Sequence, residues 1–305
     1  MLSVLSRHKS RLSLTAAAAA WGIATVISKR AVEEIPPLTL LRIQLFVSVA
    51  VLTVLVRAQR LELRWSPQMR RLGVLGILNP GASYALSLLG LSYISASLSV
   101  LLWAVEPLLI LAIAWWLLGD RITMPLAAAS ALALAGVLLV ILVPGSRGRF
   151  VGIALTLAGV AACAIYTVVS AKLMDTNSTL AIVTVQQSCA LVFSLGLFAA
   201  TATINQTALL PAASAAAWVS AVVAGVLYYA AAFWFYLTGL RGVPAAVAGV
   251  FINLIPVFGI AAGYFLLAER LSGRQWLGAL LIVVAVAGMA RHQSRQHASR
   301  GPLPR

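Results

Sequence analysis

Ten apolar stretches in the chain are each long enough to cross a lipid bilayer as a helix. A spanning helix needs about 20 mainly apolar residues. The whole sequence is 62% hydrophobic and 10% charged, whereas soluble domains average about 45–50% apolar and about 25% charged residues. We therefore expect an all-α integral membrane protein with ten transmembrane helices and no separate soluble domain. The predicted spans are residues 12–31, 37–56, 70–90, 95–118, 123–143, 150–171, 178–203, 215–238, 243–267 and 274–290.

Positive charges are distributed unevenly between the two sides of this predicted bundle. If both termini are cytoplasmic, 15 lysines and arginines lie on that side, 6 lie on the other and Arg42 lies within a span, which accounts for all 22. Cytoplasmic loops of membrane proteins carry an excess of Lys and Arg. The sequence therefore predicts a multi-pass protein of the cell inner membrane with N- and C-termini cytoplasmic. Because this topology explains the formal charge of +15, no nucleic-acid partner is expected.

The two halves of the chain repeat one another at an offset of 149 residues. At this offset Pro107 corresponds to Pro256, and Asp120 corresponds to Glu269. Since five spans per half is an odd number, the halves must cross the membrane in opposite orientations, as in secondary transporters. We expect two inverted five-helix repeats around a central cavity near the middle of the membrane. The predicted domains are residues 1–145 and 146–305.

Several short motifs, taken in order, resemble the drug/metabolite transporter superfamily. They are Trp21-Gly22 in the first predicted span, Arg42 in the second, Glu106-Pro107 in the fourth, and the acid–arginine pairs Asp120-Arg121 and Glu269-Arg270. Over residues 12–290 the pattern is similar to ten-helix EamA-type metabolite exporters, and most of all to the YddG-type aromatic amino-acid exporters. The resemblance implies export of aromatic and other neutral amino acids, or related small metabolites, by alternating access. The second half has Ile255 in place of Glu106, so any role of this acid is not duplicated.

Glu106 is the one acid, of seven in the chain, that falls near the middle of a predicted span. A charge at the bilayer centre costs on the order of 3 kcal/mol or more, so it normally faces the protein interior. Glu106 could contact a substrate amine, carry a coupling proton, or be a structural carboxylate beside Pro107. Arg42 lies about five residues into the second span and could contact a substrate carboxylate, pair with Glu106, or extend to the membrane interface.

Three prolines, Pro80, Pro107 and Pro256, lie ten or more residues from either end of a predicted span. Each removes a backbone hydrogen bond in mid-helix. Such breaks are tolerated where the freed carbonyl faces protein or a water-filled cavity, and paired breaks at corresponding positions indicate a transport site. We therefore expect hinges at these prolines. The alternative is that proline is simply more common in membrane helices than in soluble ones.

Aromatic and amide side chains deep in the predicted spans are candidates for substrate contact. Trp103 lies three residues before Glu106, so the two share a helix face, and a ring beside a carboxylate suits an aminated aromatic solute. Asn79 and Asn253 lie close to proline breaks, where an unpaired amide in hydrocarbon would be costly. For any single aromatic, the alternative is packing against lipid or a neighbouring helix. The predicted substrate contacts are Trp21, Arg42, Asn79, Tyr84, Trp103, Glu106, Tyr166, Tyr229, Phe251 and Asn253.

The sequence favours a transporter over an enzyme. No group of His, Cys, Asp and Glu has metal-ligand spacing, and the three histidines fall in the tails, so we expect no metal, cofactor or catalytic residue. One arginine inside the spans is too few for phosphorylated substrates. Export of lipophilic cationic drugs and a non-saturable metabolite channel are the alternatives to amino-acid export. We expect a functional monomer whose partners are a small-molecule substrate and the lipid bilayer.

Overall fold

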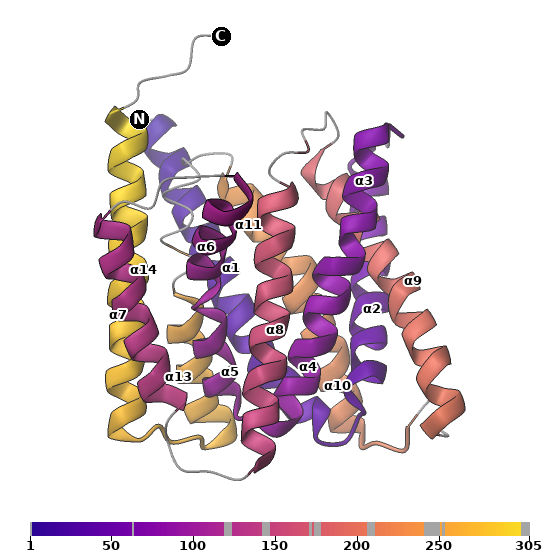
Figure 1. The fold of residues 1–305 in the computed structure, drawn as a ribbon. Coiled ribbons are helices and arrows are strands. Elements are labelled where there is room, and N and C mark those ends of the chain that lie inside the picture. Colours follow the sequence, from indigo (N-terminus) through magenta and orange to yellow (C-terminus); the bar gives the residue numbers. More distant parts are fainter. Residues whose placement is uncertain are drawn as a thin grey trace.

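Apolar helices form the part of the chain that the computed structural model describes, with no strand among them (Figure 1). The described residues are 2–62, 64–118, 124–141, 147–170, 173, 178–205, 211–240, 251 and 254–299. The first half contains α1 (Leu2–Val32), α2 (Pro37–Ala58), α3 (Pro67–Gly76), η1 (Ile77–Ala82), α4 (Ser83–Tyr93), α5 (Ala96–Trp103), α6 (Glu106–Leu118) and α7 (Met124–Ile141). The second half contains α8 (Arg147–Ser170), α9 (Thr179–Asn205), α10 (Ala215–Gly225), η2 (Val226–Ala231), α11 (Ala232–Leu240), α13 (Ile255–Leu267) and α14 (Gly273–Ser299).

Described helices fall at each of the ten predicted spans, although residues 243–250, 252 and 253 of the ninth lie outside the described part. Seven helical segments are long and apolar enough to cross a membrane, and three shorter apolar helices, Ala127–Val140, Ile255–Leu267 and Gly273–Ala285, fall at the remaining predicted positions. Three spans consist of two α-helical pieces: α3 and α4 are joined by η1, α10 and α11 by η2, and α5 is followed by α6. The prediction of an all-α membrane protein with ten transmembrane helices is therefore confirmed.

The two halves have the same order of helices and run in opposite directions. Helix boundaries repeat at the sequence offset of 149 residues: η1 and η2 begin at Ile77 and Val226, α6 and α13 at Glu106 and Ile255, and α7 and α14 at Met124 and Gly273. In Figure 1, α1 runs from the upper to the lower face, whereas its counterpart α8 runs from the lower to the upper. The repeats are therefore inverted. Their limits at residues 1–145 and 146–305 stay a prediction, because residues 142–146 lie outside the described part.

The two faces of the bundle are distinguished by the segments that they carry. The first residues of α1 and the last of α14 lie at one face, which we call the terminal face (Figure 1). The connection between α1 and α2 lies at the opposite face, which we call the α1–α2 face. Both ends of the chain therefore leave the bundle on the same side, as an even number of spans requires.

The backbone departs from regular α-helix at all three prolines singled out in the sequence. Residues 104 and 105 leave the helix, and α6 then restarts with Glu106 and Pro107 in its first turn. The start of α13 has Pro256 in the same place. Proline is favoured there because the first N–H groups of a helix have no intrahelical partner. In η1, Asn79 before Pro80 is extended, with φ −143° and ψ 118°. Hinge motion at these places stays a prediction.

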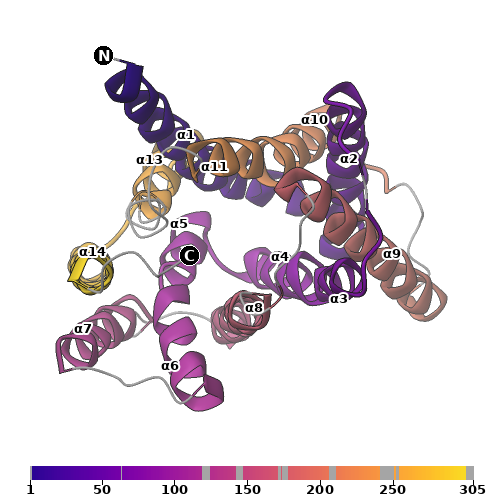
Figure 2. The same cartoon turned by 90° about the horizontal axis from the view of Figure 1, so that it is seen from above.

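Small residues bring helices of the two halves into close contact. A Cβ atom on Gly22 of α1 would lie 2.7 Å from the backbone N of Gly259 and 2.7 Å from the carbonyl oxygen of Ile255, both in α13. A Cβ atom on Gly136 of α7 would lie 2.7 Å from the carbonyl oxygen of Gly278 in α14. Figure 2 shows the same two pairs of helices side by side when the bundle is viewed along its axis. Such glycine contacts permit close approach of membrane helices, and the first one places the start of α13 beside α1.

Candidate substrate-binding site

A cavity of about 370 Å³ lies between the two halves of the bundle. Small-molecule sites in proteins have volumes of about 300–1,000 Å³. Six of the ten predicted substrate contacts line this cavity, together with one predicted hinge: Trp21, Asn79, Tyr84, Trp103, Glu106, Tyr166 and Pro107. Their role in binding stays a prediction, but the fold brings them together around one space.

The cavity adjoins the places where the helical backbone is interrupted. Asn79 in η1, Pro107 at the start of α6 and Ile255 at the start of α13 all line it. Tyr228 from η2 lines it as well. π-Helical turns often occur at functional sites, and broken helices in membranes are tolerated where they face a cavity. The irregular backbone of both halves therefore converges on one space.

Glu106 is the acidic group of this cavity. As the first residue of α6 it lies at the positive end of the helix dipole, which stabilises a carboxylate. The Sγ–H of Cys163 on α8 donates a hydrogen bond to its Oε1 over 3.2 Å. No Lys, Arg or His is among the described residues of the cavity wall. The wall therefore combines one acid with aromatic rings and hydroxyl groups.

Four packed rings close the cavity towards the α1–α2 face, and we call Tyr84, Trp103, Tyr228 and Tyr229 the aromatic layer. The ring of Tyr84 lies in the middle, with centroid distances of 5.6 Å to Trp103, 5.1 Å to Tyr228 and 5.2 Å to Tyr229. Each such pair contributes about 0.5–1.5 kcal/mol beyond the burial of its area. These contacts stabilise the packing of the four rings, and Tyr84, Trp103 and Tyr228 separate this cavity from a smaller one.

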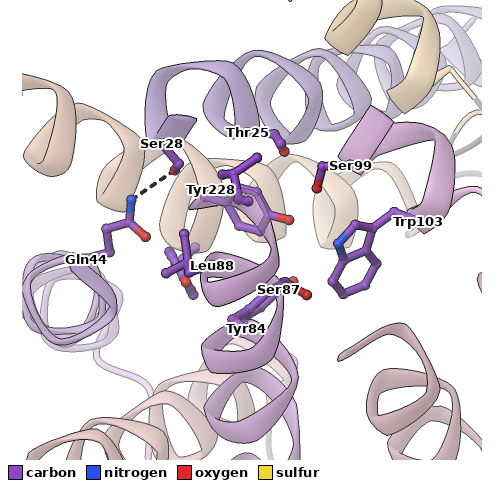
Figure 3. Close-up of a pocket in the computed structure, with 11 residues that line it drawn as sticks. Thr25, Ser28, Gln44, Tyr84, Ser87, Leu88, Ser99, Trp103 and Tyr228 are labelled. Carbon is purple, nitrogen blue, oxygen red and sulfur yellow. Dashed lines mark hydrogen bonds between the residues drawn. The ribbon is translucent and has the colours of Figure 1, made fainter. Parts of the chain in front are cut away.

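A second, small cavity of about 20 Å³ lies beyond the aromatic layer (Figure 3). The Nε2 of Gln44 donates to the Oγ of Ser28 over 2.9 Å at its edge, and Ser99 also lines it. The Oγ of Ser87 is buried there and has no hydrogen-bond partner within the described part of the chain. A polar space of this size suits one water molecule. Polar groups therefore continue from the aromatic layer towards the α1–α2 face.

Two carboxylates tie the halves together at the α1–α2 face, and we call these contacts the carboxylate caps. Glu269 of the second half accepts hydrogen bonds from the N–H groups of Ala96 (2.7 Å) and Ser97 (2.8 Å), which begin α5 in the first half. Glu34 of the first half accepts from the N–H (2.7 Å) and the Oγ–H (2.8 Å) of Ser214, which precedes α10 in the second half. Each acid satisfies donors at a helix N-terminus, where negative charge is favoured.

The two hydrogen bonds from Ser214 also affect the acidity of Glu34. The N–H of Ser214 and, next, its hydroxyl stabilise the ionised carboxylate, so the pKa of Glu34 lies below its ordinary value of 4.5. This cap is therefore charged at neutral pH.

Three of the remaining predicted contacts, Arg42, Tyr229 and Phe251, are not among the lining residues of the larger cavity. Tyr229 is buried in the aromatic layer and lines the small cavity instead. Arg42 is buried in α2 with its guanidinium 3.8 Å from the centroid of the Phe198 ring, a cation–π contact away from the cavity. The carbonyl of Phe251 accepts the N–H of Leu254 over 3.0 Å, next to the start of α13. Asn253 lies outside the described residues.

The two other predicted hinges differ from Pro107 in their surroundings. Pro80 and Pro256 are both buried. Neither lines the larger cavity, so Pro107 alone among the predicted hinges belongs to its wall.

Several residues of the cavity wall were not predicted. On α8, Cys163 lies three residues before Tyr166 and four before Thr167, and residues three and four apart on a helix are neighbours. The same spacing joins Tyr229 to Phe233, and Phe233 to Tyr236. Helical spacing around the predicted aromatics was therefore a usable signal. The unpredicted lining residues are Thr25, Val100, Ile110, Cys163, Thr167, Tyr228, Phe233, Tyr236 and Ile255.

Comparison with known proteins agrees with this architecture. Residues 9–142 and residues 150–291 each match the model of the EamA-like transporter family. The chain belongs to this family. The two matches correspond to the two inverted repeats, and the assignment makes this EamA-like protein a membrane transporter of the drug/metabolite transporter superfamily.

Two individual proteins are similar to this EamA-like transporter over most of its length. A protein of Archaeoglobus fulgidus named as an uncharacterized transporter is 24% identical over 275 residues, which is 87% of this chain and 93% of its own. One protein with a solved crystal structure has a TM-score of 0.63 and 18% identity, over 93% of this chain and 98% of its own. At that identity the second similarity shows a common fold alone.

Proposed function

We propose that this EamA-like transporter exports aromatic and other neutral amino acids, or related small metabolites, by alternating access. The proposal rests on one observation: seven aromatic side chains and a single carboxylate surround a cavity between the inverted repeats. The substrate would enter from the cytoplasm of a cell whose inner membrane holds both termini of the chain on the cytoplasmic side. The proposal places the chain with the YddG-type aromatic amino-acid exporters.

The chemistry of the cavity wall suits a solute with an ammonium group and an apolar body. A substrate ring would stack on Trp103 and Tyr84, and its ammonium group would lie near Glu106. The indole N–H of Trp21, which has no hydrogen-bond partner within the described part of the chain, and the hydroxyl of Tyr236 offer donors for a substrate carboxylate. A phosphorylated substrate fits poorly, because phosphate groups are usually bound by several basic side chains and the described wall has none.

The mechanism proposed here alternates access by opening and closing the two faces in turn. The aromatic layer and the carboxylate caps close the α1–α2 face, which is the outer face if the termini are cytoplasmic. Opening that face would separate Glu269 from the start of α5 and would rock α6 and α13 about Pro107 and Pro256. A substrate that disturbs the ring packing of Tyr84 would favour this opening.

Export of lipophilic cations is the second candidate function. It is favoured by the same acid, because Glu106 is the one charged side chain among the described lining residues. An amine that lacks a carboxylate would satisfy Glu106 and the aromatic rings equally well. The two functions differ in whether the substrate has a carboxylate that accepts hydrogen bonds from the donors of the cavity wall.

Competition in proteoliposomes distinguishes these candidates. Vesicles containing the purified protein and loaded with unlabelled phenylalanine should accumulate labelled phenylalanine by exchange, and excess threonine or methionine should compete. The variant Trp103→Ala should reduce phenylalanine exchange by roughly tenfold, because a ring-to-ring contact and its buried area are lost. Trp116→Ala is the matched control, since Trp116 is 77% exposed on the outside of the bundle. Competition by tetraphenylphosphonium, but by no amino acid, would reverse the order of the two candidates.

A further inference from the structure

A separate cavity of about 610 Å³ opens on the side of the bundle, between α2, η1 and α9, with Trp65 of the segment before α3 at its edge. Figure 2 shows α2, α3 and α9 together at one edge of the molecule. We propose that this side cavity, called the lateral groove, binds an anionic phospholipid. One acyl chain would lie along the apolar wall of the groove, and the phosphate would lie at Arg57. The inference goes beyond the transport function and does not depend on it.

The wall of the lateral groove is suited to an acyl chain. Val56, Ile77, Val185, Val192 and Phe193 are among its lining residues. Val192 is 69% exposed and Ile77 is 39% exposed, so the apolar wall faces the surroundings of the bundle and not its core. In a membrane those surroundings are lipid chains. A concave apolar surface of this kind holds a chain in place, whereas a flat surface does not.

The charged end of the groove distinguishes an anionic lipid from a neutral one. Arg57 lines the groove at the last turn of α2. Trp65 lines it too and is 69% exposed, and exposed tryptophans of membrane proteins concentrate at the level of lipid headgroups. The groove therefore runs from hydrocarbon depth to a cationic group at the membrane interface, which matches the shape of a phospholipid.

The positive charge at this end of the groove is larger than Arg57 alone. The segment from residue 57 to residue 71 contains five arginines and one acid, Glu62. Glu62 accepts a hydrogen bond from Arg64 over 3.3 Å, so one of the five charges is balanced locally. Basic clusters beside a transmembrane helix attract anionic lipids. The arginines are Arg57, Arg60, Arg64, Arg70 and Arg71.

The lateral groove and the substrate cavity share one structural element. Ile77 of η1 lines the lateral groove, whereas Asn79 of the same turn lines the substrate cavity. A lipid chain against Ile77 would therefore pack on the outer side of a helix break whose inner side faces the substrate. Occupation of the groove should favour the observed conformation of η1, and anionic lipid should consequently alter the rate of transport.

Native mass spectrometry of the purified chain tests the lipid site without any substrate. The protein is mixed with equal amounts of phosphatidylglycerol and phosphatidylcholine, and the lipids that remain bound are counted. The wild type should retain one phosphatidylglycerol in preference to phosphatidylcholine. Arg57→Gln should lower that preference by about fivefold, because one basic side chain near the headgroup is removed. Val192→Trp should lower retention of both lipids, because the new side chain fills the groove.

Two substitutions outside the lateral groove serve as matched controls. Arg274→Gln removes an exposed arginine at the opposite face, and Val219→Trp enlarges a side chain that is 61% exposed on α10. Both should retain lipid as the wild type does, and all variants should elute as the wild type does in size-exclusion chromatography.

Equal retention of the two lipids by the wild type would overturn the anionic part of the proposal, as would an unchanged preference in Arg57→Gln. Unchanged retention in Val192→Trp would overturn the groove as the site. Because no amino acid is present, these outcomes are independent of whether the proposed substrate is correct.

Discussion

Replacement of Glu269 by glutamine tests whether the carboxylate caps keep the α1–α2 face closed. The two oxygens of Glu269 accept the N–H groups of Ala96 and Ser97 at 2.7 and 2.8 Å. These residues are the first two of α5, so their N–H groups have no partner inside the helix. The amide of a glutamine has one acceptor oxygen and one NH₂ group. It can satisfy only one of the two donors.

The cost of the substitution follows from these contacts. An N–H group left without an acceptor in a partly buried place costs about 1–3 kcal/mol. Loss of the negative charge at the N-terminus of α5 costs about 0.3–1 kcal/mol more. A destabilisation of about 2 kcal/mol corresponds to roughly a 30-fold shift of the equilibrium from the closed towards the open face.

Thiol labelling at the small cavity measures this shift. Ser99 lines the small cavity beyond the aromatic layer and is 2% exposed. A Ser99→Cys reporter, in a chain with Cys163 and Cys189 replaced by serine, should react slowly with a membrane-impermeant reagent applied at the α1–α2 face. Adding Glu269→Gln should raise the labelling rate by tenfold or more, and Glu269→Asp should restore part of the protection.

A second acid serves as the control for this experiment. Glu62→Gln removes an exposed acid that contacts Arg64 within its own connection and bridges no repeats, so labelling should stay unchanged. The labelling rate of the reporter with Glu269→Gln could instead stay within twofold of the rate without it, while transport and folding are intact. The Glu269 cap would then stabilise the fold without setting the open–closed equilibrium, and our reasoning would be wrong.

Three further predictions concern single contacts. The pKa of Glu34 is lowered chiefly by the backbone N–H of Ser214, so the ionised Glu34 stabilises the fold fully above pH 4.5, its ordinary pKa, and loses this effect as the pH falls below that value. The difference in melting temperature between the wild type and Glu34→Gln should therefore persist from pH 7 to 5 and vanish in stronger acid. Gly22→Ala should lower stability by about 1–3 kcal/mol, because the new methyl group meets rigid backbone of α13; Gly196→Ala, which meets nothing within 4 Å, should not. Glu106→Gln should weaken binding of amino acids, measured by calorimetry, by about 10- to 100-fold if the carboxylate holds the ammonium group; unchanged affinity would make Glu106 structural.

The spans and the repeat were predictable because both depend on local sequence. Membrane thickness sets the length of an apolar stretch, and the offset of 149 residues relates the helix starts at Glu106 and Ile255. The backbone geometry at each helix interruption was harder to predict from the sequence. Pro107 suggested a kink within one helix, whereas the helix ends before residue 104 and restarts at Glu106. The π-helical turn that begins at Val226 contains no proline, so its sequence gave no indication of a helix interruption.

The composition of the cavity wall was partly predictable, because the depth of an aromatic residue in its span can be read from local sequence. Deep aromatics such as Trp21 and Trp103 marked the correct helices, and spacing along those helices extends the set. Arg42 illustrates the limit. It lies in the first turns of α2, as its place in the predicted span implies. The direction of its side chain depends on Phe198, 156 residues later in the sequence. The carboxylate cap at Glu269 joins residues 173 apart, and single-sequence patterns contain no signal for such a pair.

Uptake by proteoliposomes is the most direct test of the central claim that this EamA-like transporter moves neutral and aromatic amino acids. Labelled phenylalanine, threonine and methionine would be supplied separately, with and without a pH gradient, to vesicles with and without the protein. We predict protein-dependent, saturable uptake, with phenylalanine taken up at the lowest concentration. Dependence on the pH gradient would add proton coupling, with Glu106 as the first group to test. Absence of uptake for all three amino acids, or flux that rises linearly without saturation, would contradict the proposed function.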